Sequence, residues 1–137
     1  MLLEKTYPIL WKVSEECWEY YSEGGMTFVY THAKGRVHLK RHEKKLGHEH
    51  SERKLNRDEI TKLKLFFEKV FFTPYPEGIS EKTEVFLSGF LSALDKDAPN
   101  AYWELMDYED YEYGVDLSLL MIESRDYHQL DLSWSYD

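Results

Sequence analysis

Histidines are the first residues in this sequence whose type and spacing could do chemistry. Five of the six lie between residues 31 and 57, where His48 and His50 flank a glutamate and bring three donor groups close together. The segment that begins at His42 nevertheless lacks the second histidine, four residues on, that a zinc-protease helix needs. The single cysteine, Cys17, cannot complete a structural zinc site, and the neighbouring lysines and arginines disfavour a bound cation. The sequence therefore predicts solvated histidines and no metal site.

Motifs for covalent catalysis are also missing. The sequence contains no Gly-x-Ser-x-Gly elbow and no glycine-rich phosphate loop with its lysine. Carboxylates are dense in residues 107–112, but acid–base catalysis requires two carboxylates in unlike environments, one desolvated and one hydrated. So dense a run is more typical of a solvated face. We expect no catalytic residue and no cofactor, and keep an enzyme with a site assembled from scattered residues as an alternative.

The carboxyl end combines negative charge with aromatic rings. Residues 102–137 contain ten Asp and Glu against one arginine, and so account for the net charge of −9 of the whole chain. Tyrosine and tryptophan are enriched in binding hot spots, and clustered carboxylates accelerate association with a cationic protein. The predicted partner-binding residues are the aromatic anchors Trp103, Tyr108, Tyr111 and Tyr113 and the steering carboxylates Asp107, Glu109, Asp110 and Glu112.

These features predict a small acidic binding protein that neutralises a basic protein partner, a toxin or a nuclease, in the manner of an immunity protein or a nuclease inhibitor. The acidic–aromatic run also has a purely structural interpretation. In that interpretation the tyrosines line the edge of the core, and their acidic neighbours keep the protein soluble.

A basic segment at residues 34–57 offers an alternative from another class, a regulatory protein that binds nucleic acid or phosphate. Lysines and arginines would contact phosphates there. However, no aromatic residues alternate with the lysines, and the acidic end repels a phosphate backbone, so the sequence disfavours direct nucleic-acid binding. Self-association is a further alternative, with the basic segment of one copy meeting the acidic end of another.

Length and composition favour one domain, residues 1–137, with enough apolar and aromatic side chains (42% and 16%) to form a core. No window approaches the length of a membrane span, and the first residues lack the pattern of a signal peptide. One cysteine fits a reducing compartment. We therefore expect a cytoplasmic protein that does not enter membranes.

Periodicity predicts an α+β fold in which antiparallel β-hairpins pack against about three helices. Apolar residues at helical spacing indicate helices at 7–22, at 80–95 and between Asn56 and Thr73, where Asn56 and Glu59 form a capping-box pattern. A polar segment, 42–57, is expected to be a loop or a frayed helix, and 102–106 a short turn of helix. Alternation indicates hairpins that pair residues 26–31 with 36–41 and residues 115–121 with 130–136.

Overall fold

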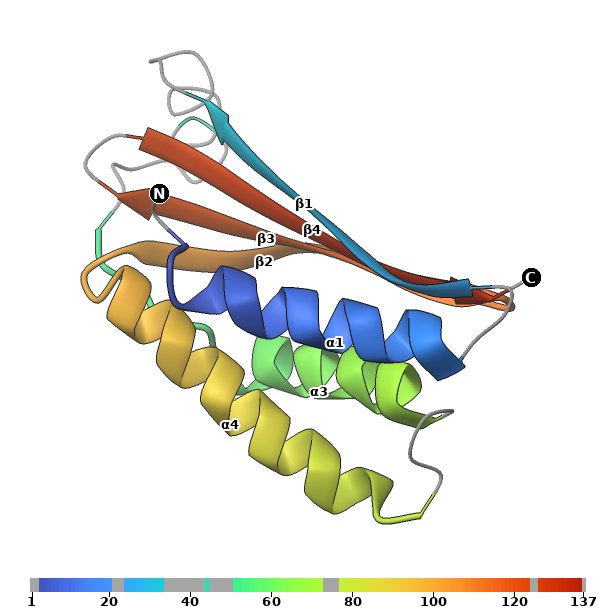
Figure 1. Cartoon of the computed structure of the whole chain (residues 1–137). Coiled ribbons are helices and arrows are strands. Elements are labelled where there is room, and N and C mark those ends of the chain that lie inside the picture. The colour runs from blue at the N-terminus through green and yellow to red at the C-terminus, as the bar shows by residue number, and fades with distance from the viewer. Residues whose placement is uncertain are drawn as a thin grey trace.

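The computed structural model describes residues 3–20, 24–33, 44, 51–72, 77–123 and 126–136. In chain order its elements are α1 (Thr6–Tyr20), β1 (Gly24–Ala33), α3 (Arg57–Phe72), α4 (Ile79–Asp97), β2 (Tyr102–Tyr111), β3 (Gly114–Glu123) and β4 (Asp126–Tyr136). Figure 1 shows α1, α3 and α4 on one side of a twisted sheet whose other side carries none of these helices. This arrangement confirms the predicted α+β fold, with helices on one face of an antiparallel sheet.

The sheet has the strand order β1-β4-β3-β2 and is antiparallel throughout. β3 and β4 form the predicted hairpin at the end of the chain. β1 contains the predicted strand 26–31 and pairs along its length with β4, so the first and last strands of the chain lie side by side (Figure 1). The predicted hairpin partner of β1, residues 36–41, lies outside the described residues.

The three predicted helices are confirmed, and their ends differ from the predictions by one or two residues. α3 buries Leu63, Phe66 and Phe67 completely, because their spacing puts them on the side of the helix that faces the sheet and α4. Phe67 packs against Phe86 and Phe90 of α4, with ring centroids 4.6 and 5.2 Å apart. Each such side chain stabilises the fold by about 1.5–3 kcal/mol relative to an exposed one. No helix in the described parts of the chain is long and apolar enough to span a membrane.

The prediction of a helical turn at 102–106 is wrong, because these residues begin strand β2. A turn of five residues makes few internal hydrogen bonds and is a weak helix, whereas pairing with β3 supplies a ladder along the whole strand. The Trp103 N–H also donates to the Arg53 carbonyl at 2.9 Å, and the Arg53 N–H donates to the Ala101 carbonyl at 3.2 Å. The segment that precedes α3 therefore covers the start of the outer edge of β2.

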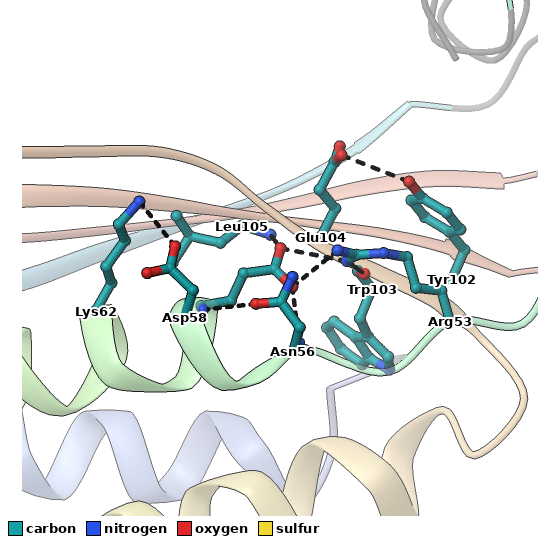
Figure 2. Close-up of polar contacts among 9 residues, drawn as sticks. Arg53, Asn56, Asp58, Lys62, Tyr102, Trp103, Glu104 and Leu105 are labelled. Atoms are coloured by element: carbon teal, nitrogen blue, oxygen red, sulfur yellow. Dashed lines mark hydrogen bonds and ion pairs between the residues drawn. The ribbon is translucent and has the colours of Figure 1, made fainter. Parts of the chain in front are cut away.

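The side chain of Glu59, 9% exposed, ties the amino end of α3 to β2. It forms the predicted capping box: Glu59 N–H donates to Asn56 Oδ1 at 2.9 Å and Asn56 N–H donates to Glu59 Oε1 at 2.8 Å. Glu59 Oε2 accepts the Leu105 N–H at 2.8 Å. The Arg53 guanidinium contacts both carboxylate oxygens, at 3.0 and 3.2 Å, and also donates to the Trp103 carbonyl (Figure 2). One carboxylate thus sets the position of β2 relative to α3.

Candidate partner-binding surface

The sheet face without helices carries charge of one sign. None of the four strands contains a lysine or an arginine. Successive side chains of a strand point to opposite faces, so Asp116 points away from the helices while Val115 and Leu117 on either side of it are buried in the core. Glu109 lies opposite Asp116, and Asp131 lies opposite Ser118 in the β3–β4 register. At its other end this face buries Tyr102, Leu120 and Ile122 in a separate apolar cluster, so we call only the part that carries Asp107, Glu109, Asp116 and Asp131 the open face. No lysine or arginine of the strands neutralises its carboxylates.

A β-bulge in β2 determines which acidic side chains reach the open face. Leu105 lies opposite Leu119, and Asp107 already lies opposite the next residue of β3, so Met106 is the extra residue. Strict alternation from Leu105 would turn Asp107 and Glu109 toward the helices. The shift in register instead places both carboxylates on the open face, where both are exposed.

Two other carboxylates of the open face are held by neutral donors. Asp116 Oδ1 accepts a hydrogen bond from Ser133 Oγ at 2.6 Å. Asp131 Oδ1 accepts hydrogen bonds from Ser118 Oγ at 2.6 Å and from Gln129 Nε2 at 2.8 Å. Hydroxyl and amide donors fix the orientation of a carboxylate without cancelling its charge. These two groups are therefore oriented anions that still attract an external cation.

Of the predicted aromatic anchors, Tyr111 and Tyr113 are on the surface. Their exposed fractions are 39% and 55%, and both lie where β2 turns into β3. Trp103 is only 4% exposed and belongs to the core, and Tyr108 is half-buried against the core. Two exposed tyrosines are thus available for contact at one end of the open face.

Three of the predicted steering carboxylates are also exposed. Asp107, Glu109 and Glu112 are exposed, and their side chains form no hydrogen bond or ion pair with any residue that the structure describes. Asp110 differs, because it lies on the helix side of β2 and forms an ion pair with Lys69 of α3. The free negative charge of the predicted set is therefore that of Asp107, Glu109 and Glu112.

The tyrosines of this region act as neutral hydroxyls. Burial, and then the nearby Asp116 carboxylate, raise the pKa of Tyr111 above its ordinary value. Burial followed by Asp110 does the same to the pKa of Tyr108. Because an unperturbed tyrosine already titrates near pH 10, both rings remain hydrogen-bond donors at neutral pH. The negative charge of the surface belongs to its carboxylates alone.

The chain matches no protein-family model, no curated protein and no solved structure. Its own geometry indicates what the open face can do. Oriented carboxylates accept hydrogen bonds from lysine and arginine, and exposed tyrosine rings pack against the aliphatic stems of such side chains. The open face is thus suited to contact a cationic protein surface.

A hollow of about 670 Å³ lies on the helical side, between α1, the end of α3 and the start of α4. Its apolar wall includes Val13, Phe71 and Phe86, and its charged residues are lysines and glutamates. Among the residues that the structure describes, those that line the hollow include no histidine, cysteine or serine. The described lining therefore presents lysine ammonium groups and glutamate carboxylates around an apolar wall.

The basic segment 34–57 falls largely outside the described residues, which include Lys44 and residues 51–57 of it. Within that described part, Arg53 pairs with Glu59. Lys54 forms an ion pair with Asp95 and donates to the Pro99 carbonyl at 2.7 Å. Both side chains therefore already bind acceptors within the same molecule.

A second group of polar side chains, missed by the sequence reasoning, lies at the opposite end of the sheet on the helix-covered face. His32 and His128 lie directly opposite each other in the β1–β4 register, and their rings stack with centroids 4.3 Å apart and planes 12° apart. Asp126 Oδ2 is 3.5 Å from His32 Nε2, and the Tyr30 hydroxyl is 2.7 Å from His128 Nδ1. One donor atom from each of His32, Asp126 and His128 lies within 4.8 Å of the others, so these three residues could hold a metal ion.

Burial governs the electrostatics of this second group. His128 is 5% exposed, and burial, followed by the neighbouring His32, lowers the pKa of His128 to about 4, with Asp126 acting in the opposite sense. The ring is therefore neutral at pH 7. In the sequence, alternation already indicates that His128 lies on the same face as the apolar Leu130 and Leu132. Its pairing with His32 could not be found in this way, because it depends on the long-range contact between β1 and β4.

Proposed function

We propose that this protein binds and neutralises a basic protein partner, in the manner of an immunity protein or a nuclease inhibitor, through the open face of its sheet. The observation that carries the proposal is the distribution of charge. Four strands without a lysine or arginine present five carboxylates on the face that α1, α3 and α4 leave uncovered. These carboxylates are Glu104, Asp107, Glu109, Asp116 and Asp131.

The residues of the surface have two roles in this proposal. Asp107, Glu109 and Glu112 are exposed and unpaired among the described residues, so they would attract the partner over a distance of about 8 Å at physiological ionic strength. Asp116 and Asp131 are already oriented by hydrogen bonds, so contact with lysine or arginine would require little further ordering.

Tyr111 and Tyr113 would supply the apolar part of the contact. Their rings are exposed beside the carboxylates, and each loses few rotamers on binding. The partner expected from this chemistry is a protein with a patch of lysine and arginine. A phosphate backbone would be repelled by the same surface.

The experiment starts with capture of the partner from the native host on immobilised wild-type protein, followed by purification of the captured protein. Association rates are then measured over a salt series for the wild type and for a triple variant, Asp107→Asn, Glu109→Gln and Glu112→Gln. Removing three steering charges should slow association at low salt about tenfold or more and flatten its salt dependence.

The matched control is a second triple variant, Glu15→Gln, Glu52→Gln and Glu77→Gln, which removes the same charge from exposed positions outside the sheet. Its association rate should stay close to that of the wild type. Capture of no basic protein, or equal rates for the two triple variants at every salt concentration, would contradict the proposal.

A further inference from the structure

We propose that His32, Asp126 and His128 bind a divalent transition-metal ion, with Zn²⁺ as the best-fitting ion, and that Tyr30 is the positioning residue of this site. The inference concerns the helix-covered face at the far end of the sheet. It is independent of the binding role proposed for the open face.

The set of donors fits zinc. Two imidazoles and one carboxylate are ligands that zinc accepts, with metal–ligand distances of about 2.0–2.2 Å and one position left for water. Donor atoms of a tetrahedral site of that size are about 3.4 Å apart, and the three donor atoms here all lie within 4.8 Å of one another. A contraction of about 1.4 Å would close the site, which is within reach of side-chain rotation.

The Tyr30 hydroxyl selects the atom of His128 that remains free. It lies 2.7 Å from Nδ1, so Nε2 is the nitrogen left for a metal. Histidine ligands of metals are commonly held through their second nitrogen in this way, which fixes the direction of the ring. Because His128 is only 5% exposed, the surrounding core restrains its ring further. The site therefore has one rigid ligand.

The stacked arrangement shows which ligand must move. An imidazole nitrogen donates in the plane of its ring, and two parallel rings cannot direct their lone pairs at one ion. The side chain of His32 is 31% exposed and that of Asp126 is 39% exposed, so both can turn toward His128 without disturbing the core. Metal binding should therefore unstack His32 from His128.

Glu123 gives a second reason for a cation at this place. It lies directly opposite Asp126 in the β3–β4 register, and alternation puts it on the same face as Met121, which is opposite His128. Its Oε2 atom is buried and has no hydrogen-bond partner in the structure as described. Two carboxylates thus share one end of the β3–β4 hairpin, and a bound cation would offset their charge. Arg125, which stands between them in the sequence, lies outside the described residues.

The test measures Zn²⁺ binding by isothermal titration calorimetry on the full chain, after removal of metals with a chelator. Four other histidines are replaced first (His38→Gln, His42→Gln, His48→Gln and His50→Gln), so that they cannot compete for zinc. This background should bind one Zn²⁺ per chain and melt at a higher temperature with zinc than without it. Adding His32→Gln or Asp126→Asn should weaken binding at least tenfold. The melting temperature without zinc shows that each variant is folded.

Tyr30→Phe in the same background tests the positioning role. Loss of a partner that orients a ligand typically weakens metal binding 10- to 100-fold, and the visible spectrum of bound Co²⁺, used as a probe of the ligand geometry, should change as well. Loss of zinc binding on replacement of the four other histidines would overturn the proposal, as would unchanged affinity in both His32→Gln and Asp126→Asn. Equal zinc affinity and an unchanged Co²⁺ spectrum in Tyr30→Phe would remove Tyr30 from the site.

Discussion

Replacement of Glu59 by glutamine tests the contact that holds β2 against α3. The change conserves the shape of the side chain but replaces one carboxylate oxygen with an amide NH2 group. Each oxygen of Glu59 accepts one backbone N–H, from Asn56 or from Leu105, and contacts one nitrogen of Arg53. In either orientation of the glutamine amide, one backbone N–H and one half of the paired guanidinium lose their acceptor.

The expected loss of stability follows from these contacts. A hydrogen bond to a charged group contributes about 1.5–3 kcal/mol, and removing one partner of a fully buried ion pair costs about 3–5 kcal/mol. The Arg53 side chain is 30% exposed, so water compensates it in part, and the lower end of these ranges applies. We expect Glu59→Gln to lower the free energy of unfolding by about 3 kcal/mol. For a chain of this length that corresponds to a fall in melting temperature of about 10 °C.

The assay is urea unfolding followed by tryptophan fluorescence, since Trp103 lies beside the network (Figure 2). Asp58→Asn is the matched control, because Asp58 is the neighbouring residue, its side chain is 77% exposed, and it forms a surface ion pair with Lys62 at 3.3 Å. That variant should lose less than about 1 kcal/mol. If Glu59→Gln were no less stable than Asp58→Asn, the reasoning would be refuted.

Two further predictions concern stability. A Cβ atom at Gly114 would lie 2.3 Å from the Trp134 carbonyl oxygen, whereas one at Gly89 would meet nothing within 4 Å. In calorimetric melting, Gly114→Ala should therefore be less stable than the wild type by about 1–3 kcal/mol. Gly89→Ala, inside α4, should be more stable than the wild type by about 0.5–1 kcal/mol. A Gly114→Ala variant more stable than Gly89→Ala would contradict the close approach of β3 and β4. Asp97 accepts the Thr6 N–H at 2.9 Å and the Thr6 hydroxyl at 2.7 Å, so it caps α1 from the end of α4. Asp97→Ala should lower the free energy of unfolding in urea by about 1–2 kcal/mol, and a loss no larger than that of Asp95→Ala, an exposed residue nearby, would argue against the cap.

The helices and the last hairpin could be predicted because their signals are local. Asn56 and Glu59 mark the start of α3, and the large apolar residues that follow recur at helical spacing. Strand β2 could not be predicted in this way. Its bulge at Met106 breaks the alternation, and Asp110 points toward the helices, where Lys69 compensates it from far away in the sequence.

The predicted binding surface was only partly correct, because exposure in a strand depends on pairing as well as on local sequence. Tyr111 and Tyr113 are exposed as the binding hypothesis requires, while Trp103 is in the core. An aromatic residue among acidic neighbours has the same local pattern in both places, and only the pairing of β2 with β3 distinguishes them. The stacked pair of His32 and His128 depends on the pairing of β1 with β4, which no local pattern contains.

The bulge at Met106 has a consequence for changes in chain length. Deleting Met106 would leave a continuous ladder in which Leu105 and Asp107 keep their present partners and directions. Deleting Tyr108 would instead bring Glu109 opposite Leu117 if the bulge persists, or Asp107 opposite Leu117 if the bulge is lost. Because Leu117 is buried in the core, either outcome turns a carboxylate inward. In this strand, tolerance to a one-residue deletion is therefore concentrated at the bulge, and loss of Met106 is the deletion there that leaves both Leu105 and Asp107 with their present directions.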